Sequence, residues 1–398
     1  MSEIKYQKHF APLAWALVCA ASALSWQALT VHFNYRGNWT GPFVTGEYFA
    51  VPPALAFEHV WQDPKSYGWD GQFYHFIAHD PLPGDSMARY VEAPRLRYRR
   101  ILVPAAAFLL VFGQPAAIDW SYRIVILFFF ALGTYWTAQL VHESGRNPAW
   151  GLLFFFLPAA IASIDRMAVD VGLCALTAGF ALYTRRDRER VKLYVVLLFA
   201  GLVRDTGLLL TAAYCIWLLA AIEPLVTRIR RAALFATAAI PTLAWYLYVN
   251  LHTGRYQGGP ALSIPLSGIV DRIIHPVPST QAPAIVVFLH TCDLIAVAGV
   301  LLAFVLAFRH LAAHLRWPSG YAVLLFVALA VFFWRPGDWM EARDYGRILS
   351  PMMFLLALEV LDSGSLILLA PVCMEAPRFG AQVGGQAFGI AKGVLGLN

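Results

Sequence analysis

The stretch 119–141, DWSYRIVILFFFALGTYWTAQLV, decides the fold, because it is mainly apolar and carries no charge apart from Asp119 and Arg123 near its start. About 20 mainly apolar residues in a row are what a helix needs to cross a bilayer. With 193–222 counted as a bent pair or hairpin, the chain is predicted to be an all-α, polytopic integral membrane protein with about ten transmembrane helices. The other apolar runs occupy residues 11–31, 149–164, 168–184, 193–222, 232–250, 283–307, 319–334 and 345–362.

The composition of the whole chain indicates the same class. Of its 398 residues, 59% are hydrophobic and only 14% are charged, whereas soluble chains carry roughly 25% charged residues. Because no polar linker separates two cores, we expect residues 1–362 to form a single transmembrane domain and 363–398 to be a peripheral or disordered tail. The net charge of +6 lies mostly in short loops between apolar runs and does not indicate nucleic-acid binding. The five cysteines stand apart, which argues against a disulfide framework or a zinc site.

Basic residues predict the orientation in the membrane. They gather at Lys5 and Lys8 and in the segments 185–192, 228–231 and 309–316. Cytoplasmic loops carry an excess of lysine and arginine, so these clusters should lie inside and the long loop 32–100 outside. The run 101–113 is apolar but too short for a full span, and we expect it to form a half-inserted or re-entrant helix.

The first outer loop, 32–100, is long and rich in aromatic residues, unlike a disordered segment. Its centre, residues 69–81, reads WDGQFYHFIAHDP. The apolar side chains in this string predict a short amphipathic helix that lies on the membrane surface. Asp70 falls at its start, where a carboxylate suits the helix dipole and can cap the helix. By spacing alone, a capping role is the simplest interpretation of Asp70.

A dense basic cluster follows in the same loop, at Arg95, Arg97, Arg99 and Arg100. Basic residues on the outer face work against the predicted orientation, so they need another reason to be there. Anionic lipid head groups or a phosphate-bearing substrate would supply one, since arginine binds phosphate through paired hydrogen bonds. The alternative is a solvated loop.

Two strings in this loop carry a resemblance to known families. WDGQFYHFIA, at 69–78, resembles the WDxxxFxxIA motif of PIG-V-type mannosyltransferases, and RYRRILVP, at 97–104, is similar to a block in bacterial membrane proteins of cell-surface glycopolymer formation. Both groups belong with the GT-C glycosyltransferases. GLVRDTG at 201–207 and DYGRILSP at 344–351 are similar in kind to later segments of that superfamily. In layout the resemblance covers roughly residues 10–360, but only the first loop carries a specific motif.

The resemblance implies a GT-C-like fold and a sugar transfer on the extracytoplasmic face of a bacterial cytoplasmic membrane. The donor would be a polyprenyl-phosphate sugar, and the acceptor a lipid-linked or cell-surface glycan. Many GT-C enzymes have paired acidic residues, whereas Asp70 is followed by Gly71, which leaves the second acid open. Asp70 would be the catalytic base. The other expected site residues are Arg97, Arg99, Arg100, Arg204 and Arg347 for the leaving phosphate, Trp69, Gln72 and Tyr74 for the substrate, and Asp80 and Asp170 as reserve acids.

The pair Arg204–Asp205 interrupts an apolar run. Ionisable residues inside a membrane segment are usually functional, but two neighbouring opposite charges can also pair with each other at a hairpin end. The sequence leaves both interpretations open.

We expect no metal and no other cofactor in the reaction, because His75, His79 and Asp80 lack the spacing of a ligand set. Two other functions stay open: a transporter or flippase for a lipid-linked glycan, and a non-catalytic scaffold with partner subunits in a polysaccharide assembly complex. Transporters usually have internal repeats and polar residues near the bilayer midplane. Here the ionisable residues gather at outer helix ends and in one outer loop, which favours the enzyme.

Overall fold

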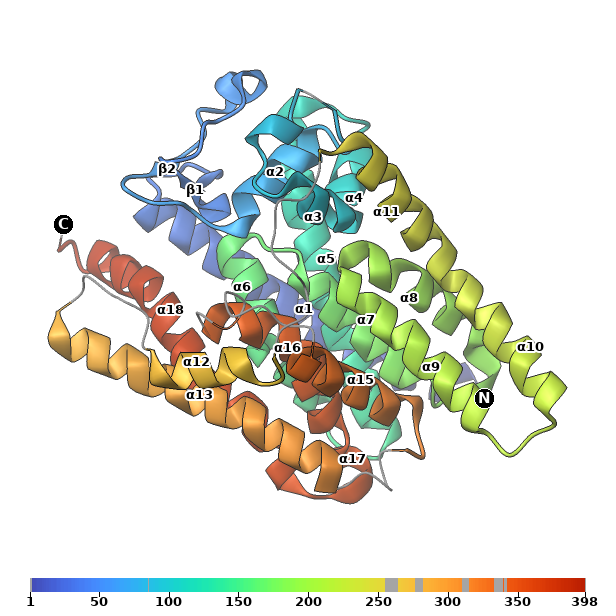
Figure 1. Cartoon of the computed structure of the whole chain (residues 1–398). Helices are drawn as coiled ribbons and strands as arrows, with labels where there is room; N and C mark the ends of the chain where they lie inside the picture. The colour runs from blue at the N-terminus through green and yellow to red at the C-terminus, as the bar shows by residue number, and fades with distance from the viewer. Residues whose placement is uncertain are drawn as a thin grey trace.

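The computed structural model describes residues 2–84, 86–254, 264–275, 282–309, 315–332, 339 and 342–397. In this part of the chain the regular structure is almost entirely helical, which confirms the predicted all-α class (Figure 1). Two short strands, β1 (Thr45–Gly46) and β2 (Gln62–Asp63), pair in parallel within the first long loop.

The bounds of the helices follow the apolar runs of the sequence. The first half contains α1 (Ser2–Asn34), α2 (Asp70–His79), α3 (Pro94–Arg99), α4 (Leu102–Leu110), α5 (Ile118–Glu143), α6 (Pro158–Arg166), α7 (Asp170–Tyr183), α8 (Arg190–Val203) and α9 (Leu208–Ala220). The second half contains α10 (Leu225–Ala236), α11 (Ile240–His252), α12 (Ser267–Ile274), α13 (Pro283–Arg309), α15 (Pro318–Phe332), α16 (Ala342–Leu358), α17 (Val360–Ser363) and α18 (Ala370–Val394). Short 3-10 turns join them: η1 (Gly41–Phe43), η2 (Pro53–Glu58), η3 (Ala88–Tyr90), η4 (Pro115–Ala117), η5 (Pro148–Phe156), η6 (Asp187–Glu189), η7 (Asp205–Gly207), η8 (Thr237–Ala239) and η10 (Leu366–Leu369).

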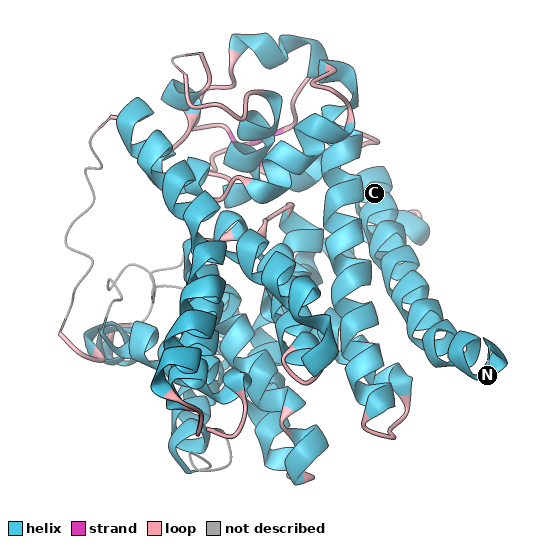
Figure 2. Ribbon diagram, turned by 90° about the vertical axis from the view of Figure 1, so that its right-hand side faces the viewer, coloured by secondary structure: helices cyan, strands magenta, loops and turns pink. Residues whose placement is uncertain are grey.

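The long helices form a bundle in which α5 is central, packed against α1 on one side and α7 on the other. Buried aromatic side chains such as Phe130, Phe180 and Phe354 fill the space between them. The elements of the first long loop, including α2 and both strands, gather at one end of the bundle, as the two views of Figures 1 and 2 show.

Five helices in the described residues are long and apolar enough to cross a membrane: Phe10–Asn34, Pro115–Glu143, Leu225–His252, Pro283–Arg309 and Leu366–Val394. A bent pair, η5 with α6, would make a sixth span, and its two parts meet at 64°. Other predicted spans form shorter helices. The run 168–184 gives α7 with 14 residues, and 193–222 divides at Arg204 into α8 and α9.

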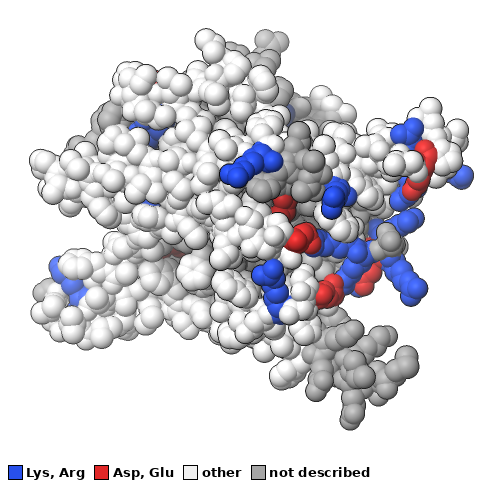
Figure 3. All heavy atoms as spheres, turned by 90° about the horizontal axis from the view of Figure 1, so that it is seen from below, with Lys and Arg blue, Asp and Glu red and all other residues white. Residues whose placement is uncertain are grey.

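The surface fits a bilayer environment. Large apolar side chains stand exposed on the outer helices, among them Phe128, Leu247 and Val287, each more than half exposed. Exposed apolar area on this scale marks an interaction with lipid or protein rather than with water. Seen from below the bundle, most charged side chains gather toward one side and much of the face is uncharged (Figure 3). Together with the long apolar helices, this identifies a membrane-embedded protein.

The helix predicted in the first loop exists, but its predicted position on the membrane surface is wrong. Every residue of α2 from Gly71 to Ala78 is buried, including the polar side chains of Gln72 and His75. The helix packs against α4 and α5. Its polar residues are tolerated inside because they face backbone groups or charged side chains there.

The prediction of a peripheral or disordered tail is also wrong. Residues Ala370–Val394 form the helix α18, which packs along α13 and contacts α1 and α16. Arg378 of α18 donates from Nε to Asp293 of α13 at 2.8 Å, and Asp293 also accepts from Arg272 of α12. The side chain of Asn34 donates to the backbone oxygen of Gln386 at 3.0 Å. These long-range bonds between buried and half-buried groups hold a glycine-rich segment for which the sequence alone predicted a peripheral or disordered tail.

Asp293→Asn tests this anchoring. The change leaves two arginines near an uncharged amide, and removing one partner of a buried ion pair costs about 3–5 kcal/mol. We expect a large drop in the thermal unfolding temperature of the purified protein in detergent. Asp362→Asn is the matched control, because Asp362 pairs with Arg185 at the surface, where ion pairs contribute about 0–1 kcal/mol. Equal effects of the two changes would contradict the anchoring role.

Candidate active site

The site begins at the first turn of α2. Trp69 precedes the helix in an extended conformation and Asp70 is its first residue. The interpretation of Asp70 as the helix cap is wrong, because Trp69 holds the cap position and the carboxylate of Asp70 binds arginine side chains. Gly71 follows because another backbone lies close: a Cβ there would be 2.2 Å from the carbonyl oxygen of Arg166 and 3.0 Å from that of Phe43. The motif therefore brings the carboxylate to a tight crossing of α2 with the end of α6.

Two arginines hold Asp70 from opposite ends of the sequence. Arg97 Nη2 lies 2.8 Å from Asp70 Oδ1, and Arg347 Nη2 lies 3.2 Å from Oδ2. Burial disfavours the charged carboxylate, but the attraction of Arg97 and Arg347 outweighs it and holds the pKa of Asp70 well below its usual range. Asp70 is thus a carboxylate at any physiological pH.

Arg347 also contacts a second buried carboxylate, that of Asp170. Arg347 Nη1 lies 3.4 Å from Asp170 Oδ2, and Arg204 binds the other oxygen of Asp170. Asp170 is the first residue of α7 and is 3% exposed, and Arg204 is 4% exposed. The mutual pairing of Arg204 with Asp205, which the sequence left open, is therefore not what the fold uses. Asp170, expected as a reserve acid, is paired with Arg204 and Arg347 through its two oxygens.

Arg100 extends the cluster on the side of α3. Its Nη1 donates to the hydroxyl of Tyr74 at 3.1 Å, and its Nη2 lies 3.8 Å from Asp205 Oδ1. Tyr74 is completely buried and its ring also lies 5.8 Å from the guanidinium carbon of Arg97. Four buried arginines thus gather around two largely buried carboxylates, and we call this set the arginine cluster: Arg97, Arg100, Arg204 and Arg347 with Asp70 and Asp170. The carboxylates of Asp205 and Asp344 stand at its more exposed rim.

Three of the buried arginines have an N–H group that donates no hydrogen bond within the described part of the chain. The Nε atoms of Arg97, Arg100 and Arg204 are buried and have no hydrogen-bond acceptor among the described residues. A buried donor without an acceptor costs about 1–3 kcal/mol, and in a native structure it calls for a bound group. A ligand with several acceptor oxygens, such as a phosphate, matches this set of donors.

Arg99 lies apart from the cluster. Its Nη2 donates to Asn250 Oδ1 at 2.9 Å, and its guanidinium carbon lies 5.1 Å from the ring centre of Tyr246. Arg95 donates to the backbone oxygens of Asn250 and Thr253. Both cations therefore hold the C-terminal end of α11, where the helix dipole favours positive charge. The expectation that Arg99 binds the phosphate is not supported by this position.

Gln72 and Asp80 also have other roles than expected. The side chain of Gln72 accepts from the backbone N–H of Gly46 at 3.2 Å and donates to the carbonyl of Tyr67 at 2.8 Å, so it holds the loop. Asp80 follows α2 at its other end and accepts from Ser86 at 2.8 Å. A helix of ten residues separates Asp80 from Asp70 by about 15 Å, too far for a reserve acid.

Trp69 does reach the cluster. Its ring centre lies 5.4 Å from the guanidinium carbon of Arg166 and 5.6 Å from that of Arg347, so it packs between two cations. Asp344 and Arg166 were not expected from the sequence, and Asp205 was expected only as part of the pair with Arg204. Asp344 lies 2.9 Å from Arg347 at a spacing of i, i+3, a helical signal that was readable. The placement of Asp205 and Arg166 depends on tertiary contacts.

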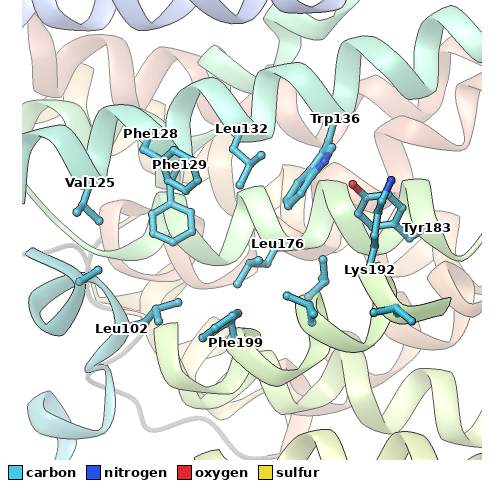
Figure 4. A pocket seen from close by; sticks show the side chains of 14 residues that line it. Leu102, Val125, Phe128, Phe129, Leu132, Trp136, Leu176, Tyr183, Lys192 and Phe199 are labelled. Atoms are coloured by element: carbon cyan, nitrogen blue, oxygen red, sulfur yellow. The ribbon is translucent and has the colours of Figure 1, made fainter. Parts of the chain in front are cut away.

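An apolar groove of about 440 Å³ lies between α4, α5, α7 and α8. Figure 4 shows Phe129, Leu132 and Trp136 of α5 facing it from one side and Phe199 of α8 from the other. Leu102, two residues after Arg100, lines one part, and Lys192 is the one charged residue of the lining. Such a groove suits a lipid chain rather than a polar ligand.

In the sequence, the spacing of His75, His79 and Asp80 argues against a set of metal ligands. Asp80 indeed lies outside, but Glu58 and Asp119 take its place beside the two histidines. Both carboxylates come from elements distant in sequence, so the spacing along α2 could not indicate them.

Comparisons of the chain with protein-family models, with curated proteins and with solved structures found no significant match. What the site can do therefore has to be argued from its own geometry.

Gly71→Ala tests the close crossing that positions Asp70. The added methyl would overlap backbone rather than a flexible side chain, and overpacking of this kind costs about 1–3 kcal/mol. We expect lower thermal stability in detergent. Gly84→Ala is the control in the same loop, since a Cβ there would meet nothing closer than 3.9 Å. A Gly71→Ala protein as stable as wild type would show that α2 does not need this approach.

Proposed function

We propose that the chain is a GT-C-like membrane glycosyltransferase. It would transfer a sugar from a polyprenyl-phosphate donor to a lipid-linked or cell-surface glycan acceptor. The observation that carries the proposal is the carboxylate of Asp70 between Arg97 and Arg347, beside buried arginine donors that lack acceptors. Glycosyl transfer from a phosphate needs a carboxylate base and cations for the leaving group within one site.

We further propose the placement in the cell. With the bent pair and the shorter apolar helices counted as spans, the chain would cross a bacterial cytoplasmic membrane about ten times. The basic segments 185–192 and 228–231 would face the cytoplasm, and the loop 32–100, with Asp70, would face outside. Partner subunits of a glycan assembly complex would be compatible with this arrangement.

In the proposed reaction an acceptor hydroxyl attacks the anomeric carbon of the donor sugar from the face opposite the phosphate. The bond between that carbon and the phosphate oxygen breaks, and the configuration inverts. Asp70 takes the proton of the hydroxyl. The electron pair of the broken bond stays on the polyprenyl phosphate, where Arg97, Arg100 and Arg347 stabilise the new charge. We expect this reaction to need no metal, because guanidinium groups stand ready for the phosphate.

The low pKa of Asp70 makes it a poor base while both arginines bind it. Donor phosphate oxygens would compete with the carboxylate for Arg97 and Arg347, since both are good bidentate partners of guanidinium. As those arginines turn to the phosphate, the pKa of Asp70 would rise toward its ordinary range and its basicity would increase. The carboxylate would thus become an effective base only when the donor is bound.

The apolar groove supports a lipid-linked donor. It starts at Leu102, close in sequence to Arg100, and its walls are almost entirely apolar (Figure 4). A polyprenyl chain in the groove would place its phosphate toward the arginines. Burial of each CH₂ group contributes about 0.8 kcal/mol, so the chain would supply much of the binding free energy.

Asp70→Asn is the direct test of the base. A carboxamide cannot take the proton, and loss of a general base typically lowers the rate by about 10²–10⁴-fold. We expect this loss in a single-turnover assay with a polyprenyl-phosphate sugar and purified protein. Because Asn leaves the arginines without their counter-ion, the unfolding temperature and the yield must be measured beside the rate.

Asp80→Asn is the matched control, on the same helix but at its far end, and should keep wild-type activity. A wild-type rate in folded Asp70→Asn would refute the catalytic role. A transporter would show movement of lipid-linked glycan across vesicles without product, and a scaffold would show neither, so the same preparation separates the three functions.

Ala106→Phe tests the groove. A phenyl ring in the groove would displace part of the donor chain, and loss of about two CH₂ contacts costs about 1.6 kcal/mol, or somewhat more than tenfold in affinity. We expect KM to rise by this factor for a long-chain donor and to change little for a short-chain one. Ala116→Phe, at an exposed position outside the groove, should alter neither value. Equal effects on both donors would contradict a chain in the groove.

A further inference from the structure

Two histidines and two carboxylates converge on the side of α2 that faces α5. His75 and His79 are four residues apart on α2 and therefore share one helix face. Glu58 ends the turn η2, and Asp119 lies in the first turn of α5. One ligand atom from each of the four lies within 4.8 Å of every other.

The contacts among these four side chains are as short as those of ion pairs. His75 Nε2 lies 3.1 Å from Glu58 Oε2 and 2.7 Å from Asp119 Oδ1, and His79 Nε2 lies 3.0 Å from Glu58 Oε1. Yet both histidine Nε2 atoms, Glu58 Oε2 and Asp119 Oδ1 are buried without a hydrogen-bond partner among the described residues. Buried polar atoms that lack a well-formed hydrogen bond call for a bound ion or water near them, and here the side chains would have to move slightly apart to admit one.

From this geometry we propose that Glu58, His75, His79 and Asp119 bind one divalent transition-metal ion, of which Zn²⁺ is the best match. Zinc binds imidazole nitrogen and carboxylate oxygen at about 2.0–2.2 Å in a tetrahedron. Ligand atoms of such a tetrahedron stand roughly 3.4 Å apart. The observed spacings, from 2.7 Å to at most 4.8 Å, span this value, so side-chain adjustments suffice.

The charge and the surroundings fit a divalent ion. Two carboxylates and two neutral imidazoles carry two negative charges, which a divalent cation neutralises inside a buried site. Two imidazole ligands favour zinc and related transition metals over Mg²⁺ and Ca²⁺, which prefer oxygen. The ring of His75 is completely buried and stacks on Phe43 with centroids 4.1 Å apart, which fixes its direction.

Four protein ligands leave no open position, so the site would be structural rather than catalytic. It would join the loop turn η2, the helix α2 and the span α5 in one cross-link. The inference is independent of the proposed sugar transfer, because none of its ligands belongs to the arginine cluster.

The test uses the full-length protein, purified in detergent without a histidine tag. We expect about one zinc per chain by elemental analysis, a lower unfolding temperature after chelation, and recovery on adding Zn²⁺ but not Mg²⁺. His79→Asn should bind zinc more than roughly 100-fold more weakly, since even changes around a ligand cost 10–100-fold. His59→Asn is the matched control, an exposed histidine beside Glu58, and should bind like wild type.

Wild-type protein also gives a test that needs no variant. Co²⁺ added to the chelated protein should show the strong visible absorption of a tetrahedral site, and Zn²⁺ should abolish it. Absence of stoichiometric metal, of a zinc-dependent stability shift and of the cobalt spectrum would overturn the proposal and leave a proton-sharing cluster. Equal zinc loss in His59→Asn and His79→Asn would also overturn it.

Discussion

The clamp of Arg97 and Arg347 on Asp70 is the interaction on which the end of the bundle with the first long loop depends. It joins the first loop to α16, and through Asp170 and Arg204 it reaches α7 and the break between α8 and α9. Inside a protein, removing one member of such a chain leaves an uncompensated charge, which costs several kcal/mol. Each of these segments is therefore held in place by the others.

Stability alone does not account for this cluster. A buried ion pair rarely adds net stability over apolar packing, because removing two charges from water costs about as much as their attraction returns. The cluster also keeps buried guanidinium donors without acceptors, which apolar residues at the same positions would avoid. Polar groups that are costly in the free protein are reasonable where a ligand completes them, and the apolar groove between α4, α5, α7 and α8 would suit the lipid part of such a ligand.

Much of the fold class could be predicted from the sequence, because apolar length and low charge are local properties. The grouping of Asp70 with Arg97, Arg204 and Arg347 was expected from the family resemblance of motifs in separate segments of the chain. The predictions that were wrong concern features that tertiary contacts determine. The burial of α2 depends on partners for Gln72 and His75, the order of α18 on Asp293, and the roles of Arg99 and Asp80 on which element lies opposite. The pattern of apolar and polar residues along one helix does not show which other element packs against it.

The two sites at this end of the bundle share one rigid element, the helix α2. At 3.6 residues per turn, positions 75 and 79 point about 140° and 180° away from position 70 around α2. Asp70 therefore faces the arginines while His75 and His79 face Glu58 and α5. Gly71 lies between these faces, where the backbone of Arg166 leaves no room for a side chain. The helix α2 is thus fixed on opposite sides. Asp70 must lie within hydrogen-bonding distance of two arginines, and this requires that α2 does not rotate about its axis. The buried histidine–carboxylate cluster supplies that support on the side of α2 away from the arginines that hold Asp70.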